Sequence, residues 1–457
     1  MSVSPAPAKD AAPPGELRRV ITFWDAAALV VGLIIGSGIF RAPASVAAEL
    51  PSVGLIFAAW IIGGILSLAG ALAVSELGVR HPKSGGQYIF LREAFGPSVA
   101  FAFGWTNILI SRPSVLAGIA TVFAIYLAGL LGLGASAQKP LAIAAALLFT
   151  FVNCLGVKSG TRTQNAFTAA KAVGLLAMVV AAFLSGRGDF AHFAGGGVAA
   201  ATAHSLPVAM ALGLVTILYT YDGWIDVTYV GGELARPARD VPRAIILGTF
   251  GCMLLYLLAN AAYIYLLPLA EMPGHENIAG IALTKALGPA GGAVLSALVV
   301  VSTLGILNGS TLTGARVPYA MARDGMIFRS LGKVNARTGS PVNTLLFQGI
   351  FTVAVLLFAR GFDEIAGLFV STTWFFYAVS IAGLLVLRRR EARGAGPPHA
   401  EYKMPLSPWP AVLFIVVTLF TIGSDLALGG PRGLIGMGIV LAGVPVYHLW
   451  RALRPRG

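Results

Sequence analysis

Cysteine and histidine are scarce in this chain, which limits the chemistry that it can perform. The 457 residues include two cysteines, Cys154 and Cys252, and both lie in apolar segments, so no disulfide framework is expected. The six histidines lie in loops or at the ends of apolar segments, without the spacing of metal ligands or of a catalytic triad. The glycine-rich segment 82–88 lacks the G-x-x-x-x-G-K-S/T spacing of a phosphate-binding loop. We therefore predict no metal site, no cofactor and no enzyme activity.

Charged residues are scarce as well. They make up 11% of the chain, against about 25% in an ordinary soluble domain, and 57% of the residues are hydrophobic. This composition predicts a protein that crosses a lipid bilayer many times. The net charge of +13 does not indicate a nucleic-acid partner, because the basic residues form short clusters between apolar spans.

The apolar residues are grouped into twelve spans, each long enough to cross about 30 Å of hydrocarbon. We therefore predict an all-α membrane protein with twelve transmembrane helices in a single domain, 21–457, after a disordered cytoplasmic tail, 1–20. The predicted spans are 24–49, 53–78, 99–131, 140–157, 166–184, 206–233, 244–267, 290–315, 342–359, 365–387, 409–428 and 433–450.

The distribution of lysine and arginine predicts the orientation. With the N-terminus inside, the cytoplasmic loops and tails hold 23 of the 32 basic residues, and the outer loops hold five. Both termini are therefore predicted to be cytoplasmic. The remaining four basic residues lie within a span or, for Arg316, directly at the end of one, where an ionisable group indicates function by default: Arg41, Arg112, Lys171 and Arg316.

The first span is interrupted at Gly36-Ser37-Gly38. Glycine disfavours a helix interior by roughly 1 kcal/mol relative to alanine, so the backbone is expected to open here. Hydrocarbon cannot satisfy the N–H and C=O groups that a break exposes, so such a break is expected only where it lines a cavity. Close helix packing on a small-residue face is the alternative explanation of this motif.

The sixth span contains a second interruption, at 219–224, where a carboxylate and a glycine lie side by side. Broken helices at positions one and six predict two five-helix repeats, 21–184 and 205–390, with helices 11 and 12 in 408–453. This repeat is inferred from position alone.

The two breaks together suggest a ligand. The second half of span one presents the amides of Ser37, Gly38 and Ile39, which attract an anion. The first half ends in the carbonyls of Ile34 and Ile35, before Gly36, and attracts a cation. Span six offers further carbonyls near Tyr219 and Asp222. A site that holds a carboxylate on one side and an ammonium on the other fits an α-amino acid.

Four side chains near the breaks have more than one interpretation. Lys171, in the fifth span, can replace a sodium ion against the open carbonyls or carry a proton, or it can snorkel to the surface. Asp222 can read a dibasic substrate or cap the half-helix that starts near Gly223. Tyr219 and Trp224 can form an aromatic lid or ordinary packing, and packing is the better reading for Trp224. Arg112 precedes Pro113, which bends span three, and we expect the guanidinium to pair with a carbonyl or an acid.

Ten short motifs follow one another along nearly the whole chain. They are I-I-G-S-G-I-F at Ile34, E-L-G at Glu76, K-S-G-G-Q-Y at Lys83, R-P-S at Arg112, V-N-C at Val152, T-R-T-Q-N-A-F-T-A-A-K at Thr161, Y-D-G-W at Tyr221, N-G-S with a following arginine at 308–316, R-D-G at Arg323 and P-V-Y at Pro445. In this order they resemble the amino acid/polyamine/organocation superfamily, and within it the L-type branch. Its animal members are the light chains of heteromeric amino acid exchangers.

The resemblance implies a LeuT-type fold of inverted five-helix repeats that works by alternating access. It also implies residue roles: the carbonyl of Ile34 for the substrate amine, the amides of Ser37 and Gly38 for the carboxylate, Tyr219 as lid and carbonyl, Asp222 as carbonyl or side chain, and Lys171 as the cation in place of sodium. The chain departs from the family at Ile225, where the animal members carry Asn, and at 231–233, where Gly-Gly-Glu replaces Thr-Glu-Glu. These departures concern the pocket for the substrate side chain.

The sequence thus predicts a sodium-independent amino acid transporter, an exchanger, in a bacterial inner membrane, a location at which the heavy usage of alanine, glycine and arginine hints. The alternative is a proton-coupled amino acid or polyamine symporter in which Lys171 or Asp222 titrates. A channel is not indicated, because no continuous polar stripe is present. The segment 129–139 has no cysteine, although the animal light chains use one there to join their heavy subunit. No such partner is therefore expected.

Overall fold

Helices form every regular element in the part of the chain that the computed structural model describes, which is residues 17–195, 205–275, 277–358, 362–395, 401–428 and 431–452. The α-helices are α1 (Phe23–Ile34), α2 (Gly38–Glu49), α3 (Val53–Arg80), α4 (Gln87–Phe95), α5 (Pro97–Thr106), α6 (Arg112–Leu130), α7 (Gln138–Cys154), α8 (Val157–Leu184), α9 (Leu206–Thr220), α10 (Pro237–Leu266), α11 (Ile278–Leu287), α12 (Ala290–Gly314), α13 (Arg316–Arg323), α14 (Val342–Phe358), α15 (Phe362–Ala392), α16 (Trp409–Leu428) and α17 (Pro431–Ala452).

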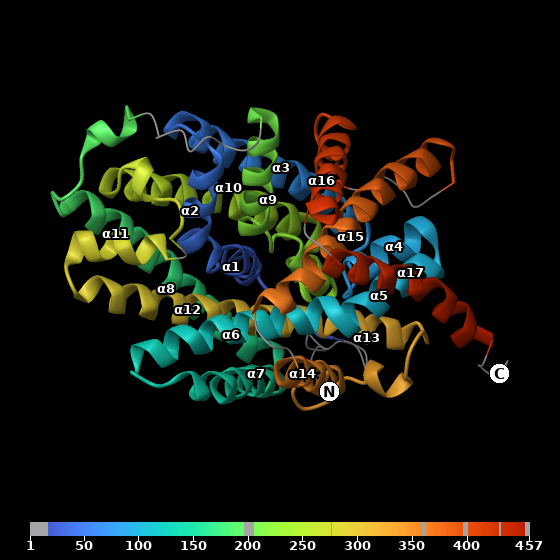
Figure 1. Ribbon diagram of the computed structural model, residues 1–457. Coiled ribbons are helices and arrows are strands. Elements are labelled where there is room, and N and C mark those ends of the chain that lie inside the picture. Colours follow the sequence, from blue (N-terminus) through green and yellow to red (C-terminus); the bar gives the residue numbers. More distant parts are fainter. Residues whose placement is uncertain are drawn as a thin grey trace, which may run out of the picture.

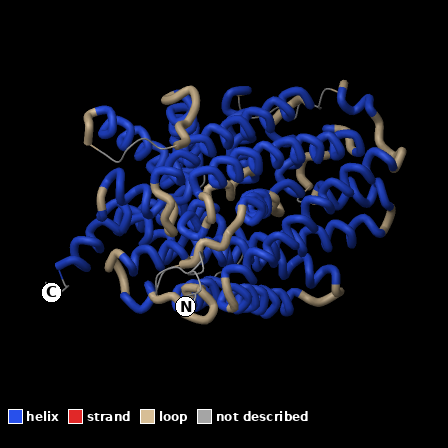
Figure 2. The backbone as a smooth tube through the Cα atoms, turned by 180° about the vertical axis from the view of Figure 1, so that it is seen from behind, coloured by secondary structure: helices blue, strands red, loops and turns tan. Residues whose placement is uncertain are grey.

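Shorter helical turns join several of these elements. One is a π-helical turn, η1 (Asn107–Ser111), between α5 and α6, and the longest 3₁₀ segment is η4 (Asp226–Glu233), which follows α9. The remaining 3₁₀ turns are η2 (Ala135–Ala137), η3 (Phe190–Phe193), η5 (Leu269–Glu271) and η6 (Arg329–Gly332). Seen from behind, the described chain is helix and loop, without a strand (Figure 2).

The chain is a multi-pass membrane protein. By length and composition, seven helical segments in the described residues can cross a membrane, and eight can if α1 and α2 form one bent span. Each of the twelve apolar segments predicted from the sequence coincides with a helix or with consecutive helical elements. Of the predicted tail, residues 1–16 lie outside the described residues, and Leu17, which follows them, is buried.

Two predicted spans begin too late. The seventh was drawn as 244–267, but α10 begins at Pro237. The fifth was drawn as 166–184, but α8 begins at Val157. The first turns of this helix are polar, and hydropathy alone therefore leaves them out. Three short helices, α4, α11 and α13, were not predicted, because each has at most ten residues and none resembles a span.

The broken first span lies in the middle of the molecule. α1 packs against α8, α10 and α12, and α2 packs against α9 (Figure 1). The N-terminus of α1 is fixed by a capping box in which Thr22 and Asp25 each bond to the other's backbone N–H. α16 and α17 both contact α15, and α17 also lies along α5. The polar interruptions at 35–37 and 221–225 are thus enclosed by other helices rather than by lipid.

Candidate functional site

The backbone between α1 and α2 is open over residues 35–37, and the two helices meet at an angle of 42°. Ile35 leaves the helical region with φ −70° and ψ 96°, and the side chain of Ser37 makes no capping bond to α2. The amides in the first turn of a helix have no partners within that helix. The first turn of α2 therefore presents N–H groups and the positive end of its dipole to whatever lies beside the break.

The second break follows α9, where Thr220 ends the helix and a turn leads into η4. Gly223 adopts φ +120° in this turn, a conformation that side chains disfavour. A Cβ atom there would lie 2.7 Å from the carbonyl carbon of Leu33 and 3.0 Å from the nitrogen of Ile34. Only glycine lets the second break approach the backbone of the first this closely.

A tyrosine that the sequence did not suggest joins the two breaks. The hydroxyl of Tyr256 on α10 lies 2.7 Å from the carbonyl oxygen of Ile34 and 3.3 Å from that of Thr220. These carbonyls belong to the last residues of α1 and α9, where helical partners are missing. Tyr256 is fully buried and packs edge-on against Trp60. It holds the carbonyl ends of both half-helices at one place.

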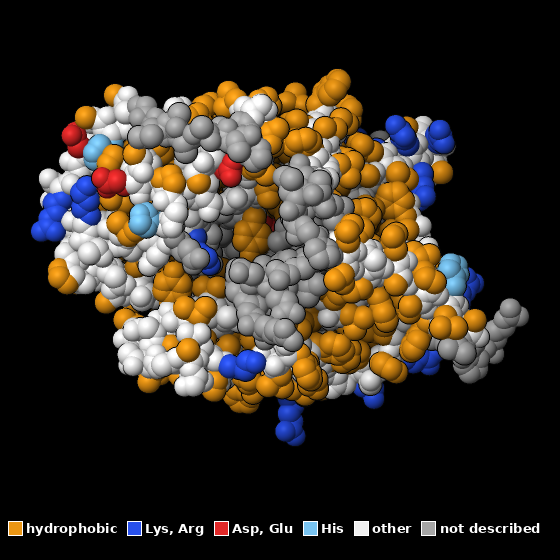
Figure 3. Space-filling view, in the orientation of Figure 1, with side chains coloured by type: hydrophobic (Ala, Val, Ile, Leu, Met, Phe, Trp, Pro, Cys, Tyr) orange, Lys and Arg blue, Asp and Glu red, His pale blue; other side chains and the backbone are white. Residues whose placement is uncertain are grey.

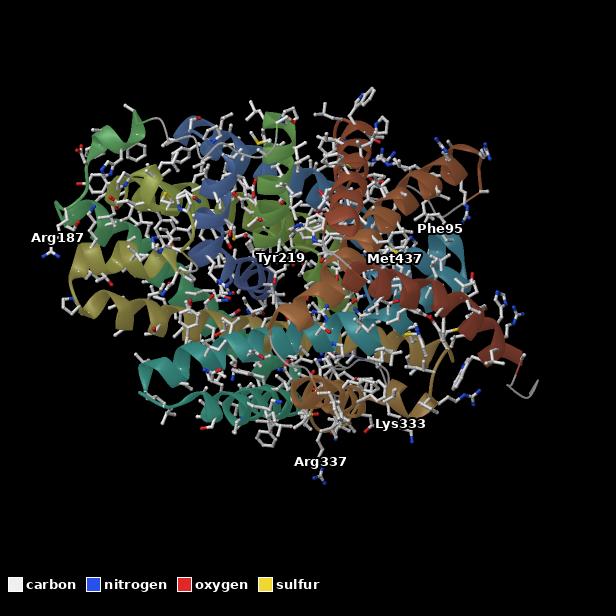
Figure 4. All side chains as sticks on the ribbon, viewed as in Figure 1. Phe95, Arg187, Tyr219, Lys333, Arg337 and Met437 are labelled. Carbon is white, nitrogen blue, oxygen red and sulfur yellow. The ribbon has the colours of Figure 1, made fainter. Side chains whose placement is uncertain are left out.

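A cavity of about 140 Å³ lies between the two breaks and the third predicted span. Seven of the predicted site residues line it: Ile34, Gly36, Ser37, Gly38, Tyr219, Asp222 and Gly223. Tyr219 is 38% exposed, so it lies where the cavity meets the surface. Figure 4 places it at the middle of the molecule beside α1, and the space-filling view shows a hollow in the same region (Figure 3).

Five predicted residues do not line this cavity: Ile35, Ile39, Trp224, Ile225 and Lys171. The side chains of Ile35, Ile39 and Ile225 are buried in the hydrophobic core. Trp224 is also fully buried and packs against Tyr377 and Phe414. The turn at Gly223 directs Trp224 into the core rather than to the surface. The geometry therefore does not support the predicted role of Trp224 in a lid.

Asp222 lies in the cavity wall. Its Oδ1 accepts a hydrogen bond from the N–H of Gly223 at 2.8 Å and one from the hydroxyl of Tyr377 at 2.8 Å. In the described residues no lysine or arginine pairs with it. Both readings of this carboxylate therefore have a geometric basis, since it caps the turn and also faces the cavity.

Lys171 lies outside the cavity, against the carbonyl end of α1. Its Nζ donates to the carbonyl oxygens of Gly32 at 2.6 Å, Ile35 at 2.9 Å and Ser302 at 2.9 Å. The hydroxyl of Ser302 donates to the Ile35 carbonyl as well, at 3.0 Å. Lys171 is 2% exposed, so it does not snorkel to the surface. An ammonium group occupies a cluster of backbone carbonyls from α1 and α12.

The wall of the cavity that the third predicted span forms contains a buried ion pair. Arg112 donates to both carboxylate oxygens of Asp226, at 2.9 and 3.3 Å, and Thr313 donates to Asp226 Oδ2 at 2.7 Å. The guanidinium also lies 5.4 Å from the ring centre of Tyr229. Arg112 was expected to pair with a carbonyl or an acid, and the structure identifies the acid. The sequence does signal Asp226, because a carboxylate within a predicted span requires a partner.

Beyond the cavity, the end of η4 is fixed by a second buried pair. Arg316 Nε donates to Glu233 Oε1 at 2.8 Å and Nη2 to Oε2 at 2.7 Å, and both side chains are almost fully buried. The backbone of Ile21 pairs with that of Glu233 and Ala235, at 2.9 Å each. This side of the cavity is closed by contacts among the N-terminal segment, η4 and α13.

Comparison with known proteins identifies the family of this chain. The family model described as amino acid permease matches residues 21–441, nearly the whole chain. The chain belongs to the amino acid permease family. This family is part of the amino acid/polyamine/organocation superfamily, and the names of its members indicate transport of amino acids.

Curated relatives of this permease cover most of its length. The serine/threonine exchanger of Bacillus subtilis is 31% identical over 94% of this chain and 97% of its own. The b(0,+)-type amino acid transporter 1 of Mus musculus is 33% identical over 89% of this chain and 82% of its own. The large neutral amino acids transporter small subunit 2 of Homo sapiens is 31% identical over 95% of this chain and 80% of its own.

Proposed function

We propose that this permease is a sodium-independent amino acid exchanger that works by alternating access. The observation that carries the proposal is the meeting of two broken helices at one cavity. The first turn of α2 presents amides, and the last turns of α1 and α9 present carbonyls. Amides at a helix N-terminus favour a carboxylate, and free carbonyls favour an ammonium group. An α-amino acid carries both groups a few ångströms apart.

In this proposal, the amides of Ser37, Gly38 and Ile39 bind the substrate carboxylate. The carbonyl of Ile34 binds the amine, with the opened segment through Ile35 and Gly36 beside it. Tyr256 occupies one acceptor position of the Ile34 oxygen, and a carbonyl oxygen has two, so one position remains for the substrate. The carbonyls of Tyr219 and Asp222 complete the amine site, and the ring of Tyr219 closes the cavity.

Sodium independence is proposed because of Lys171. Its ammonium group already binds the carbonyls of Gly32, Ile35 and Ser302. A sodium ion at the same oxygens would have to displace a positive charge that is bonded to three acceptors. Lys171 thus performs the structural part that a bound cation would perform, which is to hold the opened end of α1.

The proposed architecture is a LeuT-type fold of twelve membrane helices. The first repeat, 21–184, contains the break at 35–37, and the second, 205–390, contains the break at 221–225, with helices 11 and 12 in 408–453. The sequence distribution of lysine and arginine supports cytoplasmic termini. A bacterial inner membrane is the proposed location, and one of the relatives is bacterial.

We propose that the protein works without a disulfide-linked partner. The human relative is named a small subunit, but the segment 129–139 of this chain has no cysteine. Of the two cysteines in the chain, Cys252 is buried and Cys154 is partly buried at the end of α7. Neither lies in that segment.

Proton-coupled symport of amino acids or polyamines is the second candidate. The observation that favours it is Asp222, a carboxyl in the cavity wall whose partners in the described residues are an amide and a hydroxyl rather than a cation. Such a group is able to take up a proton together with a substrate.

Uptake into proteoliposomes tests the function and separates the two candidates. Exchange predicts that uptake of a labelled amino acid requires an amino acid inside the vesicles and is unchanged when sodium is replaced by choline. Symport predicts that an inward proton gradient drives uptake into vesicles without internal amino acid. Absence of amino acid uptake in every condition would contradict both.

A further inference from the structure

The corner between α15 and α16 presents apolar side chains that the proposed function does not use. A stripe of exposed apolar residues runs along α16, at Trp409, Val412, Leu413, Val416, Leu419 and Phe420. This spacing follows one face of a helix. In a protein that crosses a bilayer, such a face contacts lipid. Trp409 begins the stripe and is 73% exposed, and tryptophan is enriched where hydrocarbon meets the lipid headgroups.

Leu406, three residues before Trp409, has a strained backbone. Its φ is +54°, and in the described part of the chain it is the only residue other than glycine with a positive φ. This left-handed conformation costs an L-residue about 1–2 kcal/mol. The side chain is 80% exposed, so contacts within the protein do not compensate for the cost. The N–H of Trp409 donates to the carbonyl of Leu406 at 3.0 Å, and this turn holds both side chains at the same end of α16.

Basic side chains lie beside this turn. Arg389 is in the last turn of α15 and Arg393 directly follows that helix, so they are four residues apart and lie on one side of it. With Lys403 they form a set of three exposed residues that we call the basic corner. Lysine and arginine side chains gather over the end of α15 (Figure 3), which Figure 1 shows at the right of the molecule. The distribution of basic residues predicts that this is the cytoplasmic side.

Buried ion pairs fix Lys403 relative to α15. The N–H of its neighbour Met404 donates to Glu76 Oε2 at 2.7 Å, and Arg388 Nη2 donates to the Met404 carbonyl at 3.4 Å. Arg388 and Arg80 both bond to Glu76, whose side chain is fully buried. The segment before α16 is therefore bonded to α3 and α15. The basic corner is a preformed surface rather than a set of independent side chains.

The acidic residues near the basic corner do not neutralise it. Glu76 accepts from Arg388 and Arg80, and Glu391 accepts from Arg80 at 2.7 Å. Glu401 is exposed in the same segment, beside three exposed basic residues. Basic residues at the level of the headgroups attract anionic lipids by about 1 kcal/mol each. The charge of this surface is therefore complementary to an anionic headgroup.

We propose that the basic corner, together with Leu406 and Trp409, binds a phospholipid with an anionic headgroup in the cytoplasmic leaflet. The headgroup phosphate binds Arg389, Arg393 and Lys403, and the acyl chains contact Leu406 and the apolar stripe of α16. Arginine suits this site because its guanidinium can donate two parallel hydrogen bonds to a phosphate. A zwitterionic phospholipid offers the same chains without the net charge. This inference does not depend on the proposed transport function.

Quenching of a fluorophore by nitroxide-labelled lipids tests the proposal on the full-length protein in liposomes. A Ser407→Cys reporter, in a background with Cys154→Ala and Cys252→Ala, places the fluorophore between Leu406 and Trp409. Labelled phosphatidylglycerol and labelled phosphatidylcholine are compared at the same low mole fraction in unlabelled phosphatidylcholine. We expect the anionic lipid to associate at least fivefold more strongly, which corresponds to about 1 kcal/mol. The preference should decline as salt is raised from about 0.1 M to about 1 M, because the screening length falls from about 10 Å to about 3 Å.

Two triple variants separate the basic corner from the general positive charge of the cytoplasmic face. Changing the basic corner by Arg389→Gln, Arg393→Gln and Lys403→Gln should bring the ratio of the two lipids close to one. The control removes the same charge from three exposed residues between α13 and α14, by Arg329→Gln, Lys333→Gln and Arg337→Gln. Figure 4 places Lys333 and Arg337 at the opposite edge of the molecule from the end of α15. The control should keep the full preference.

Equal quenching by the two labelled lipids, in the reporter protein with an intact basic corner, overturns the proposal without any charge-removing variant. A preference that the control variant lowers as much as the basic-corner variant does overturns it as well. Displacement of labelled phosphatidylglycerol by glycerol 3-phosphate at constant ionic strength would show that the site takes a free phosphate rather than a lipid. We expect no displacement, because the soluble headgroup lacks the chains that contact Leu406 and α16.

Discussion

Lys171 illustrates how a single charged residue can hold an opened helix in place. Its three backbone acceptors come from two helices that are far apart in sequence, α1 and α12. Hydrogen bonds to a charged group contribute about 1.5–3 kcal/mol each. Gly305 on α12 makes room for this side chain, because a Cβ atom there would lie 2.9 Å from Lys171 Cε.

Replacing this lysine should disable the protein. Lys171→Ala leaves three buried carbonyls without their donor, so the opened end of α1 loses its fixed geometry. We expect the initial rate of uptake to fall at least tenfold, because the loss of one hydrogen bond to a charged group costs about 1.5–3 kcal/mol. Uptake per folded molecule in proteoliposomes measures this. Lys158→Ala, an exposed lysine on the same helix, is the control and should retain wild-type uptake. Wild-type turnover in Lys171→Ala would exclude the lysine from the mechanism.

Asp222→Asn separates the two readings of that residue. Asparagine keeps an oxygen that can accept from the Gly223 N–H and the Tyr377 hydroxyl, so the capping function remains, but the negative charge is lost. If the carboxylate binds the second positive charge of a dibasic substrate, inhibition by lysine and ornithine should weaken about tenfold or more. Inhibition by neutral amino acids should change little. Equal losses for both classes would leave only the capping role.

Residues of this site can be predicted from the sequence when they are charged and lie within an apolar span. They are missed when their role depends only on contacts with residues far away in the sequence. Lys171 and Arg112 are ionisable groups inside apolar spans, so they were recognisable. Tyr256 is an ordinary aromatic residue in an apolar span, and its hydrogen bonds to two helix ends depend on the fold.

At the scale of elements, the account depends on how closely the two breaks approach each other. The turn at Gly223 lies against the last residues of α1, and the Tyr256 hydroxyl bridges both helix ends. The sequence predicted both breaks from glycine and polar residues in apolar runs. It could not predict which way the chain turns after Gly223, and so the positions of Trp224 and Ile225 required the structure.

The Gly223→Ala substitution should therefore weaken substrate binding strongly. The new methyl group would lie within 3.0 Å of the backbone of Leu33 and Ile34, at a φ of +120°. Backbone strain of this kind amounts to about 1–3 kcal/mol, and the two breaks would have to separate. We expect substrate affinity to fall more than tenfold in competition assays.

Gly251→Ala is the matched control for this change. Gly251 lies on α10, and a Cβ atom there would meet nothing within 4 Å. Because alanine favours a helix over glycine by about 1 kcal/mol, we expect the same or slightly higher thermal stability and unchanged affinity. A Gly223→Ala protein that binds substrate like this control would show that the breaks need not touch.

At the scale of the whole molecule, alternating access requires that one side of the cavity be closed while the other opens. The contacts of Glu233 with Arg316, and of Ile21 with Glu233 and Ala235, close the predicted cytoplasmic side. Removing one partner of a buried ion pair costs about 3–5 kcal/mol, because the other charge remains buried. The Glu233–Arg316 pair is therefore expected to control how long that side stays closed.

Glu233→Gln should open the cytoplasmic side more often. A Ser310→Cys reporter in the cavity wall, in a background with Cys154→Ala and Cys252→Ala, can be labelled in inside-out vesicles with an impermeant maleimide. We expect labelling to be at least tenfold faster with Glu233→Gln, a shift of about 1.4 kcal/mol. Glu93→Gln, which breaks the partly exposed pair with Arg92, should not change the rate. Identical rates in all three proteins would mean that the Glu233 pair does not contribute to closure.

The central claim is that the backbone at two helix breaks binds both charged ends of an α-amino acid. Calorimetry on the purified protein tests it most directly, with three ligands that share one side chain: the amino acid, its decarboxylated amine and its deaminated acid. We predict that the amino acid binds and that each analogue binds at least a hundredfold more weakly, because each leaves one set of backbone groups unpaired. Binding of either analogue as tight as that of the amino acid, or no binding of any amino acid, would contradict the account.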